Sequence, residues 1–229
     1  MTRHLTPARW IAAAFLLQGV IGPVVNFGLL APALSAPPGF LQNAASHAWD
    51  VQVATLLALV GAACSVGVGL VLLSVARAET ARGLALIVLV LTVLAFAASV
   101  LEGTAIRGML ALSRAFHESG AADAGAYEPL RATLQAFRRN AHYIVLMLSC
   151  GAFIALYLCL LRLAWIPRLL AWAGVLSAVL SIGAALAPLL GGRIVFALLA
   201  PLGLCQLALI AWLFAARSAN AVRTQEVHA

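Results

Sequence analysis

The sequence predicts an all-α membrane protein, a polytopic bundle of six transmembrane helices. Two observations lead to this fold class. Hydrophobic residues make up 64% of the 229 residues and charged residues only 9%, which leaves too few polar groups to cover the surface of a soluble domain. The apolar residues also fall in long unbroken runs. Because every backbone polar group in lipid must be bonded internally, runs of this length predict helices.

Six runs are long enough to cross a bilayer, because about 30 Å of hydrocarbon needs about 20 helical residues. We expect one integral membrane domain over residues 1–229, with spans at about 10–33, 50–75, 84–101, 143–161, 169–190 and 194–215. The first run is longer than the apolar core of a signal peptide, so we expect it to be an uncleaved span. The four cysteines lie inside these runs and are expected to be packing residues.

The arginines predict the orientation. Four segments carry two each: the N-terminus, the second and fourth connections and the C-terminal tail (Arg3, Arg9, Arg77, Arg82, Arg162, Arg168, Arg217 and Arg223). Basic short loops stay in the cytoplasm, so we expect both termini there. All 14 basic side chains are arginine, which is typical of a GC-rich bacterial genome. We therefore expect this helical membrane protein to lie in a bacterial inner membrane. The charge of +7 is explained by these flanks, which favours membrane lipids over nucleic acid as partners.

The third connection predicts a helical hairpin. Residues 102–116 and 127–140 are rich in Ala, Leu and Arg, and residues 119–125 are typical of a turn. Pairing about residue 122 makes partner numbers sum to about 244, which puts Glu102 opposite His142. The third and fourth helices should therefore extend beyond the membrane.

Two short patterns resemble a known family. Tyr157-Leu158 ends a span, Ile166-Pro167-Arg168-Leu169-Leu170 follows a basic turn, and Gly174 lies inside the next span. Together with Leu101-Glu102-Gly103, this resembles an uncharacterised bacterial family of six-helix membrane proteins, domain of unknown function 4386. The resemblance implies the architecture and supplies no activity. In physical terms, Pro167 can open the fifth helix while Arg162 and Arg168 hold the turn at the anionic leaflet.

Polar residues converge near the predicted outer face. They begin the second span, end the third and begin the fourth, and the candidate ligand-binding residues among them are Glu102, Arg107, Arg138, Arg139, Asn140 and His142. Ionisable groups at the edge of hydrocarbon usually face the bundle interior in pairs. One interpretation pairs Glu102 with Arg107, Arg138 or Arg139 as a structural link. A second is a site for an anionic headgroup or small ligand. A third is a metal or haem site, for which His47, Asp50 and His142 are weak candidates; the cofactor stays unknown.

Two further patterns lie within the spans. Gln18 and Asn26 share a face with the Gly22-Pro23 break and are candidate ligand-binding residues. Gly61, Ser65 and Gly69 form a stripe of small residues, which serves either packing within the bundle or a homodimer. Three function classes remain open: binding or transport, a structural or regulatory subunit, and an intramembrane enzyme with Glu102 and His142 as acid and base.

Overall fold

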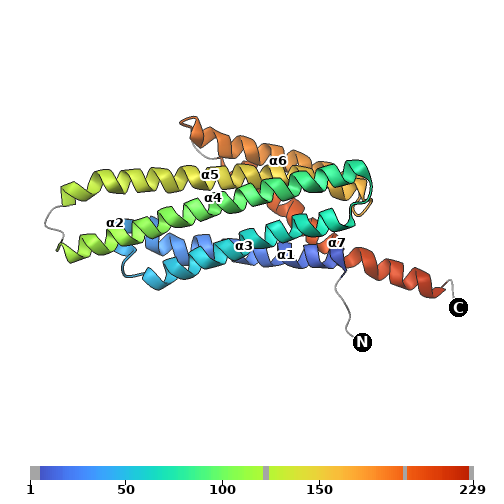
Figure 1. Cartoon of the computed structure of the whole chain (residues 1–229), viewed down its shortest axis with the longest axis horizontal. Coiled ribbons are helices and arrows are strands. Elements are labelled where there is room, and N and C mark those ends of the chain that lie inside the picture. Colours follow the sequence, from blue (N-terminus) through green and yellow to red (C-terminus); the bar gives the residue numbers. More distant parts are fainter. Residues whose placement is uncertain (1–5, 121–123, 193–194, 227–229) are drawn as a thin grey trace. The chain divides into compact units, whose positions relative to one another are not determined.

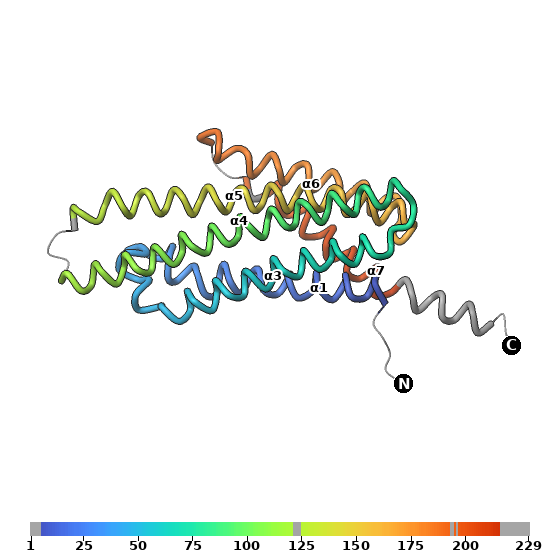
Figure 2. Tube along the Cα trace, in the orientation of Figure 1, coloured from blue at the N-terminus to red at the C-terminus, as the bar shows by residue number. Residues whose placement is uncertain are grey.

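The structure, a computed structural model, describes residues 6–120, 124–192 and 195–226, and this part of the chain is all-α. Figures 1 and 2 show the succession of helices. In chain order they are α1 (Pro7–Pro23), a π-helix η1 (Val24–Ser35), α2 (Phe40–Asn43), α3 (Ala48–Val75), α4 (Glu79–Glu118), α5 (Ala124–Arg162), α6 (Arg168–Leu189), a 3₁₀ turn η2 (Phe196–Leu198) and α7 (Ala200–Glu226).

Five helical segments are long and apolar enough to cross a membrane. They are Pro7–Ser35, Ala48–Val75, Glu79–Glu118, Gly125–Arg162 and Arg168–Leu189, and they contain the first four predicted spans and all but the last residue of the fifth. The sixth run, 194–215, is shorter as helix than predicted. Its apolar helix covers Ala200–Ala215, because α7 begins beside Pro201, a residue that favours the first turn of a helix. Residues 193–194 lie outside the described residues.

Both arms of the predicted hairpin are helical and continue the third and fourth spans, while their extension beyond the membrane stays a prediction. α4 has 40 residues and α5 has 39, about twice what a span needs. Contacts join Glu102 to His142, Gly108 to Leu134 and Ala115 to Tyr127. The residue numbers in these pairs sum to 242–244, so the predicted register is confirmed as well.

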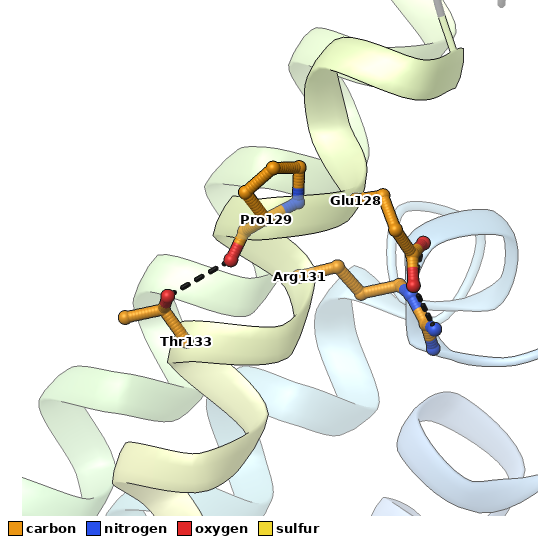
Figure 3. Close-up of polar contacts among 4 residues, drawn as sticks. All are labelled: Glu128, Pro129, Arg131 and Thr133. Carbon is orange, nitrogen blue, oxygen red and sulfur yellow. Dashed lines mark hydrogen bonds and ion pairs between the residues drawn. The ribbon is translucent and has the colours of Figure 1, made fainter.

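The beginning of α5 differs slightly from the prediction. The helix starts at Ala124, three residues before the expected arm, so Pro129 lies beyond the first turn. Figure 3 shows the hydroxyl of Thr133 donating to the carbonyl of Pro129 at 2.8 Å. It also shows Glu128 and Arg131 joined as an ion pair, with Arg131 Nε 2.7 Å from Glu128 Oε2.

The Gly22-Pro23 break becomes a change of helix type. α1 ends at Pro23 and the chain continues as the π-helix η1. Proline has no N–H for the α-helical bond to residue 19, and a π-helix uses wider hydrogen-bonded turns. The side-chain amide of Asn26 donates to the carbonyl of Gly22 at 3.0 Å. The break therefore has its own internal polar contact.

The chain forms two compact units, which we call the first and the second unit. The first comprises residues 1–17, 64–93 and 146–229, and the second comprises residues 18–63 and 94–145. Each has its own apolar core. Tyr157, Leu72 and Leu160 are fully buried in the first, and Phe40 and Met109 are among the large buried side chains of the second.

Close helix contacts in the first unit depend on glycine. A methyl group at Gly174 would lie 2.4 Å from the ring of Tyr157. At Gly67 it would lie 2.7 Å from Trp10, and at Gly69 it would lie 2.8 Å from the Cα of Leu89. A methyl group at any of these three positions would therefore force its neighbour to shift, and at Gly69 that neighbour is backbone.

The turn after α5 is a Schellman motif. Trp165 N–H donates to the carbonyl of Leu160 at 3.0 Å, and Ala164 N–H donates to the carbonyl of Leu161 at 3.0 Å. Ala164 has a φ of 54°, in the left-handed region that favours glycine. The indole N–H of Trp212 donates to the carbonyl of Trp165 at 2.9 Å. Pro167 then precedes α6, as the sequence predicts.

Candidate functional site

A carboxylate–imidazole pair lies at the centre of the predicted polar cluster. Glu102 on α4 and His142 on α5 meet with Oε1 and Nδ1 3.0 Å apart. The Glu102 side chain is only 14% exposed, whereas that of His142 is 46% exposed. With its proton on Nδ1, the imidazole donates to the carboxylate and leaves Nε2 as an acceptor. The recorded partner of Glu102 is thus His142, whereas we expected an arginine.

Of the predicted arginines, Arg138 interacts electrostatically with Glu102. It lies in the hairpin arm of α5, ahead of the predicted span, and its side chain is half-buried. Its Nε is buried and has no hydrogen-bond acceptor in the part of the chain that the structure describes. Burial lowers the pKa of the guanidinium, and the negative charge of Glu102 opposes that shift. A donor of this kind has strong affinity for an anion.

The other predicted ligand-binding residues on the hairpin are more open. Arg107, Arg139 and Asn140 are exposed. The structure therefore brings Glu102, His142 and Arg138 together as the core of the candidate site. The remaining three residues can contribute charge and hydrogen-bonding groups around it.

The helices pack closely beside Glu102. A methyl group on Gly103 would lie 3.0 Å from Cγ2 of Thr55 on α3. Thr55 is buried, and its hydroxyl donates to the carbonyl of Val51 at 2.8 Å. The Glu102-Gly103 step thus combines two roles: glycine admits α3, and the neighbouring carboxylate turns to α5.

A second carboxylate–imidazole pair joins His47, just before α3, to Asp50 in the first turn of α3. His47 Nδ1 lies 2.9 Å from Asp50 Oδ2, and both side chains are partly exposed. In the described ranges, no three His, Cys, Asp or Glu side chains gather as a metal site would require. His47, Asp50 and His142 accordingly belong to two separate pairs.

The two amides of the first span differ in exposure. Gln18 is half-buried and Asn26 is exposed. The recorded contact of Asn26 is the bond to Gly22 described above. The small-residue stripe on α3 has neighbours within the chain: Gly61 faces Ile21 at 3.7 Å from an added methyl, and Gly69 packs on Leu89. A homodimer through Gly61, Ser65 and Gly69 stays a prediction.

Sequence reasoning missed a link that fixes the hairpin arm of α4. Ser113 is fully buried; its hydroxyl donates to the carbonyl of Leu41 at 2.9 Å and accepts from the N–H of Ala45 at 3.0 Å. His117 Nε2 lies 3.0 Å from the carbonyl of Gln42. We call this group of contacts the Ser113 link. Its signal in the sequence is a serine on the same helix face as Met109, Leu110 and Phe116.

The profile of the family described as Domain of unknown function (DUF4386) matches residues 11–216 of the chain. The chain belongs to this family. A search of curated proteins and a search of solved structures each found no match.

In this DUF4386 member, the residues that suggested the family have a packing role. Tyr157 and Gly174, which are 17 positions apart, touch across α5 and α6. Gly103 does the same for α3 and α4 beside Glu102. Tyr157, Gly174 and Gly103 of the recognisable pattern therefore mark helix contacts, and Glu102 adds a carboxylate that bonds to His142.

Proposed function

We propose that this multi-pass membrane protein binds or transports a small or lipidic anionic ligand at Glu102, His142 and Arg138. The observation that carries the proposal is the buried Nε of Arg138, a charged donor with no acceptor in the described residues. Leaving such a donor unpaired is costly, and an anionic oxygen would satisfy it.

The pairing of Glu102 with His142 supports this assignment. Because the carboxylate bonds to the imidazole, it does not neutralise Arg138 through a direct ion pair in the recorded contacts. Three exposed residues lie close to this group in the sequence of the two arms: Arg107, Arg139 and Asn140. The two arginines add positive charge, and the asparagine adds an amide. A phosphate group, whether free or in a lipid headgroup, has the charge and the oxygens that this set would recognise.

The finer topology belongs to the same proposal. Six spans with both termini in the cytoplasm of a bacterium would place this site near the outer face of the inner membrane. Single cysteines at positions 36 and 220 of a cysteine-free chain should then react with an impermeant thiol reagent from opposite sides. Reaction from one side would contradict it.

The ligand test uses the full chain purified in detergent. Lipid mass analysis should find retained anionic lipid, and phosphatidylglycerol should raise the melting temperature more than phosphatidylcholine does. A rise with inorganic phosphate would assign the site to a free anion. Arg138→Gln should abolish the shift, whereas Arg114→Gln, an exposed arginine on the other arm, should preserve it. Equal shifts in both variants would overturn the proposal.

Two other functions make different predictions for the same sample. An intramembrane enzyme is favoured by the contact between Glu102 and His142, a potential acid and base. A metal or haem protein would instead show stoichiometric metal or a haem absorption band. A structural or regulatory subunit would retain a partner protein and show no response to anions.

A further inference from the structure

The hairpin arm of α5 carries exposed apolar side chains in a regular pattern. Leu130 is 55% exposed, and Phe137 and Ile144 are each 47% exposed. They are seven residues apart, so they lie on one helix face. Between residues 103 and 142, Leu130 and Phe137 are the large exposed apolar side chains of the described chain.

Two polar residues complete the pattern. Thr133 and Asn140 are exposed and fall between the three apolar residues. The intervals then alternate between three and four residues, which is the spacing of a coiled-coil seam. We call these five residues, Leu130, Thr133, Phe137, Asn140 and Ile144, the α5 stripe.

The α5 stripe has no charge, although the arm around it is strongly charged. At 100° per residue, the ionisable side chains of the arm fall on other faces of the helix (Glu128, Arg131, Arg138, Arg139 and His142). The uncharged face is therefore continuous over about 20 Å, the length of 14 residues at helical rise.

Lipid tails are poorly placed to cover this face. Phe137 and Leu130 precede the predicted span at residue 143 by 6 and 13 residues, or about 9 and 20 Å at helical rise. With these predicted bounds, both lie on the part of α5 that would continue beyond the hydrocarbon. An aqueous surface leaves such side chains hydrated, which favours association.

We infer that the α5 stripe is the contact surface for a second copy of this chain. Copies inserted in one membrane in the same direction are related by an axis along the membrane normal, so their α5 helices run parallel. A two-fold contact then places each residue of the stripe near its own copy. The three-four spacing of these uncharged residues, with an apolar side chain at every seventh position, is that of the seam of such a parallel pair.

The distribution of charge also favours the α5 stripe as the surface on which two copies of the chain meet. Each copy has a formal charge of +7 and five arginines in this connection, so most approaches of two hairpins bring like charges together. Approach along the α5 stripe avoids this. At the axis the amide of Asn140 can donate to the amide oxygen of its copy.

Oxidative cross-linking in vesicles tests the contact in the full chain, with Cys64, Cys150, Cys159 and Cys205 replaced by serine. Single cysteines at 133, 137 and 140 should form covalent dimers several-fold more efficiently than those at 132, 135 and 139, which lie on the opposite side of the same arm. Cross-linking without this periodicity would overturn the inference. Preferential cross-linking at Ser65→Cys would also overturn it and select the small-residue stripe of α3.

Single-molecule photobleaching of the labelled chain gives a second measurement. The wild-type chain should bleach in two steps, and Leu130→Glu with Phe137→Glu should shift the distribution to one step. The matched control, Ala132→Glu with Gln135→Glu, adds the same charges to the opposite side and should remain at two steps. One-step bleaching of the wild-type chain, or two-step bleaching of the stripe variant with an unchanged melting temperature, would overturn the inference.

Discussion

In the described residues, the tightest glycine contacts lie in the first unit, whereas the ion pair that joins two helices lies in the second. In the first, glycines let helices approach until ring or backbone atoms touch, as at Gly174 and Gly69. In the second, polar side chains reach from one segment to another, as in Glu102–His142 and the Ser113 link. Packing by glycine is dry and tolerates no added volume, whereas polar links tolerate volume and fail when a partner is removed. Both carboxylate–imidazole pairs lie in the second unit.

The largest effect is expected in the first unit, for Gly174→Ala. The new methyl group would overlap the ring of Tyr157, which is fully buried, so α6 or the ring would have to shift within a packed core. We expect a loss of about 3 kcal/mol, at the upper end of overpacking, measured by thermal unfolding in detergent. Gly183→Ala on the same helix is the control, because nothing lies within 4 Å of its added methyl. Equal losses of stability in the two variants would contradict the role of Gly174 in helix packing.

The next effect concerns the Ser113 link in the second unit. Ser113→Ala would leave the carbonyl of Leu41 and the N–H of Ala45 without this hydroxyl partner. We expect a loss of about 2 kcal/mol, the cost of buried polar groups left unpaired. Ser99→Ala, whose hydroxyl bonds only to the carbonyl four residues earlier in the recorded contacts, should change the melting temperature little. Hydrogen exchange at the Ala45 amide should accelerate only in Ser113→Ala.

A smaller effect is expected at the carboxylate–imidazole pair. Glu102→Gln and His142→Gln should each destabilise the chain, and the double variant should lose less than the sum, with a coupling energy of about 1 kcal/mol. Double variants test the arginine pairing that the sequence predicts. They combine Glu102→Gln with Arg107→Gln, Arg138→Gln or Arg139→Gln. A larger coupling to an arginine than to His142 would restore that interpretation.

The smallest effect is a gain at the turn after α5. Ala164 has a positive φ, which costs an alanine about 1 kcal/mol relative to a residue without a Cβ. Ala164→Gly should thus raise the melting temperature modestly, corresponding to about 0.5 kcal/mol after the entropy of the unfolded glycine is subtracted. A decrease would mean that the left-handed conformation of this turn carries no strain.

The hairpin could be predicted because its signals are local. A Gly-rich turn between two helix-forming stretches fixes which residues face each other, and the pairing of Glu102 with His142 follows from it. The choice between His142 and the arginines could not be predicted, because several basic side chains lie within reach at that register and side-chain direction decides among them.

Contacts between distant segments were beyond the local patterns. The Ser113 link joins residues whose partners lie in a different connection, and Tyr157 meets Gly174 only once α5 and α6 pack. In the sixth run, by contrast, a local pattern predicts a longer helix than the one that forms. Its hydropathy predicts a span from residue 194, but Pro201 sets where regular helix begins.

The Ser113 link also constrains the order in which the chain is made. Its hydrogen bonds join residues that are 68 to 75 positions apart. At roughly 5–20 residues per second, the ribosome needs about 3–15 s to reach residues 113–117 after residues 41–45 have been added. During that interval the Ser113 hydroxyl and the His117 imidazole do not yet exist as partners for Leu41, Ala45 and Gln42. We therefore expect the first connection to reach its final contacts late, and a chain released before α4 is complete to be more sensitive to proteases.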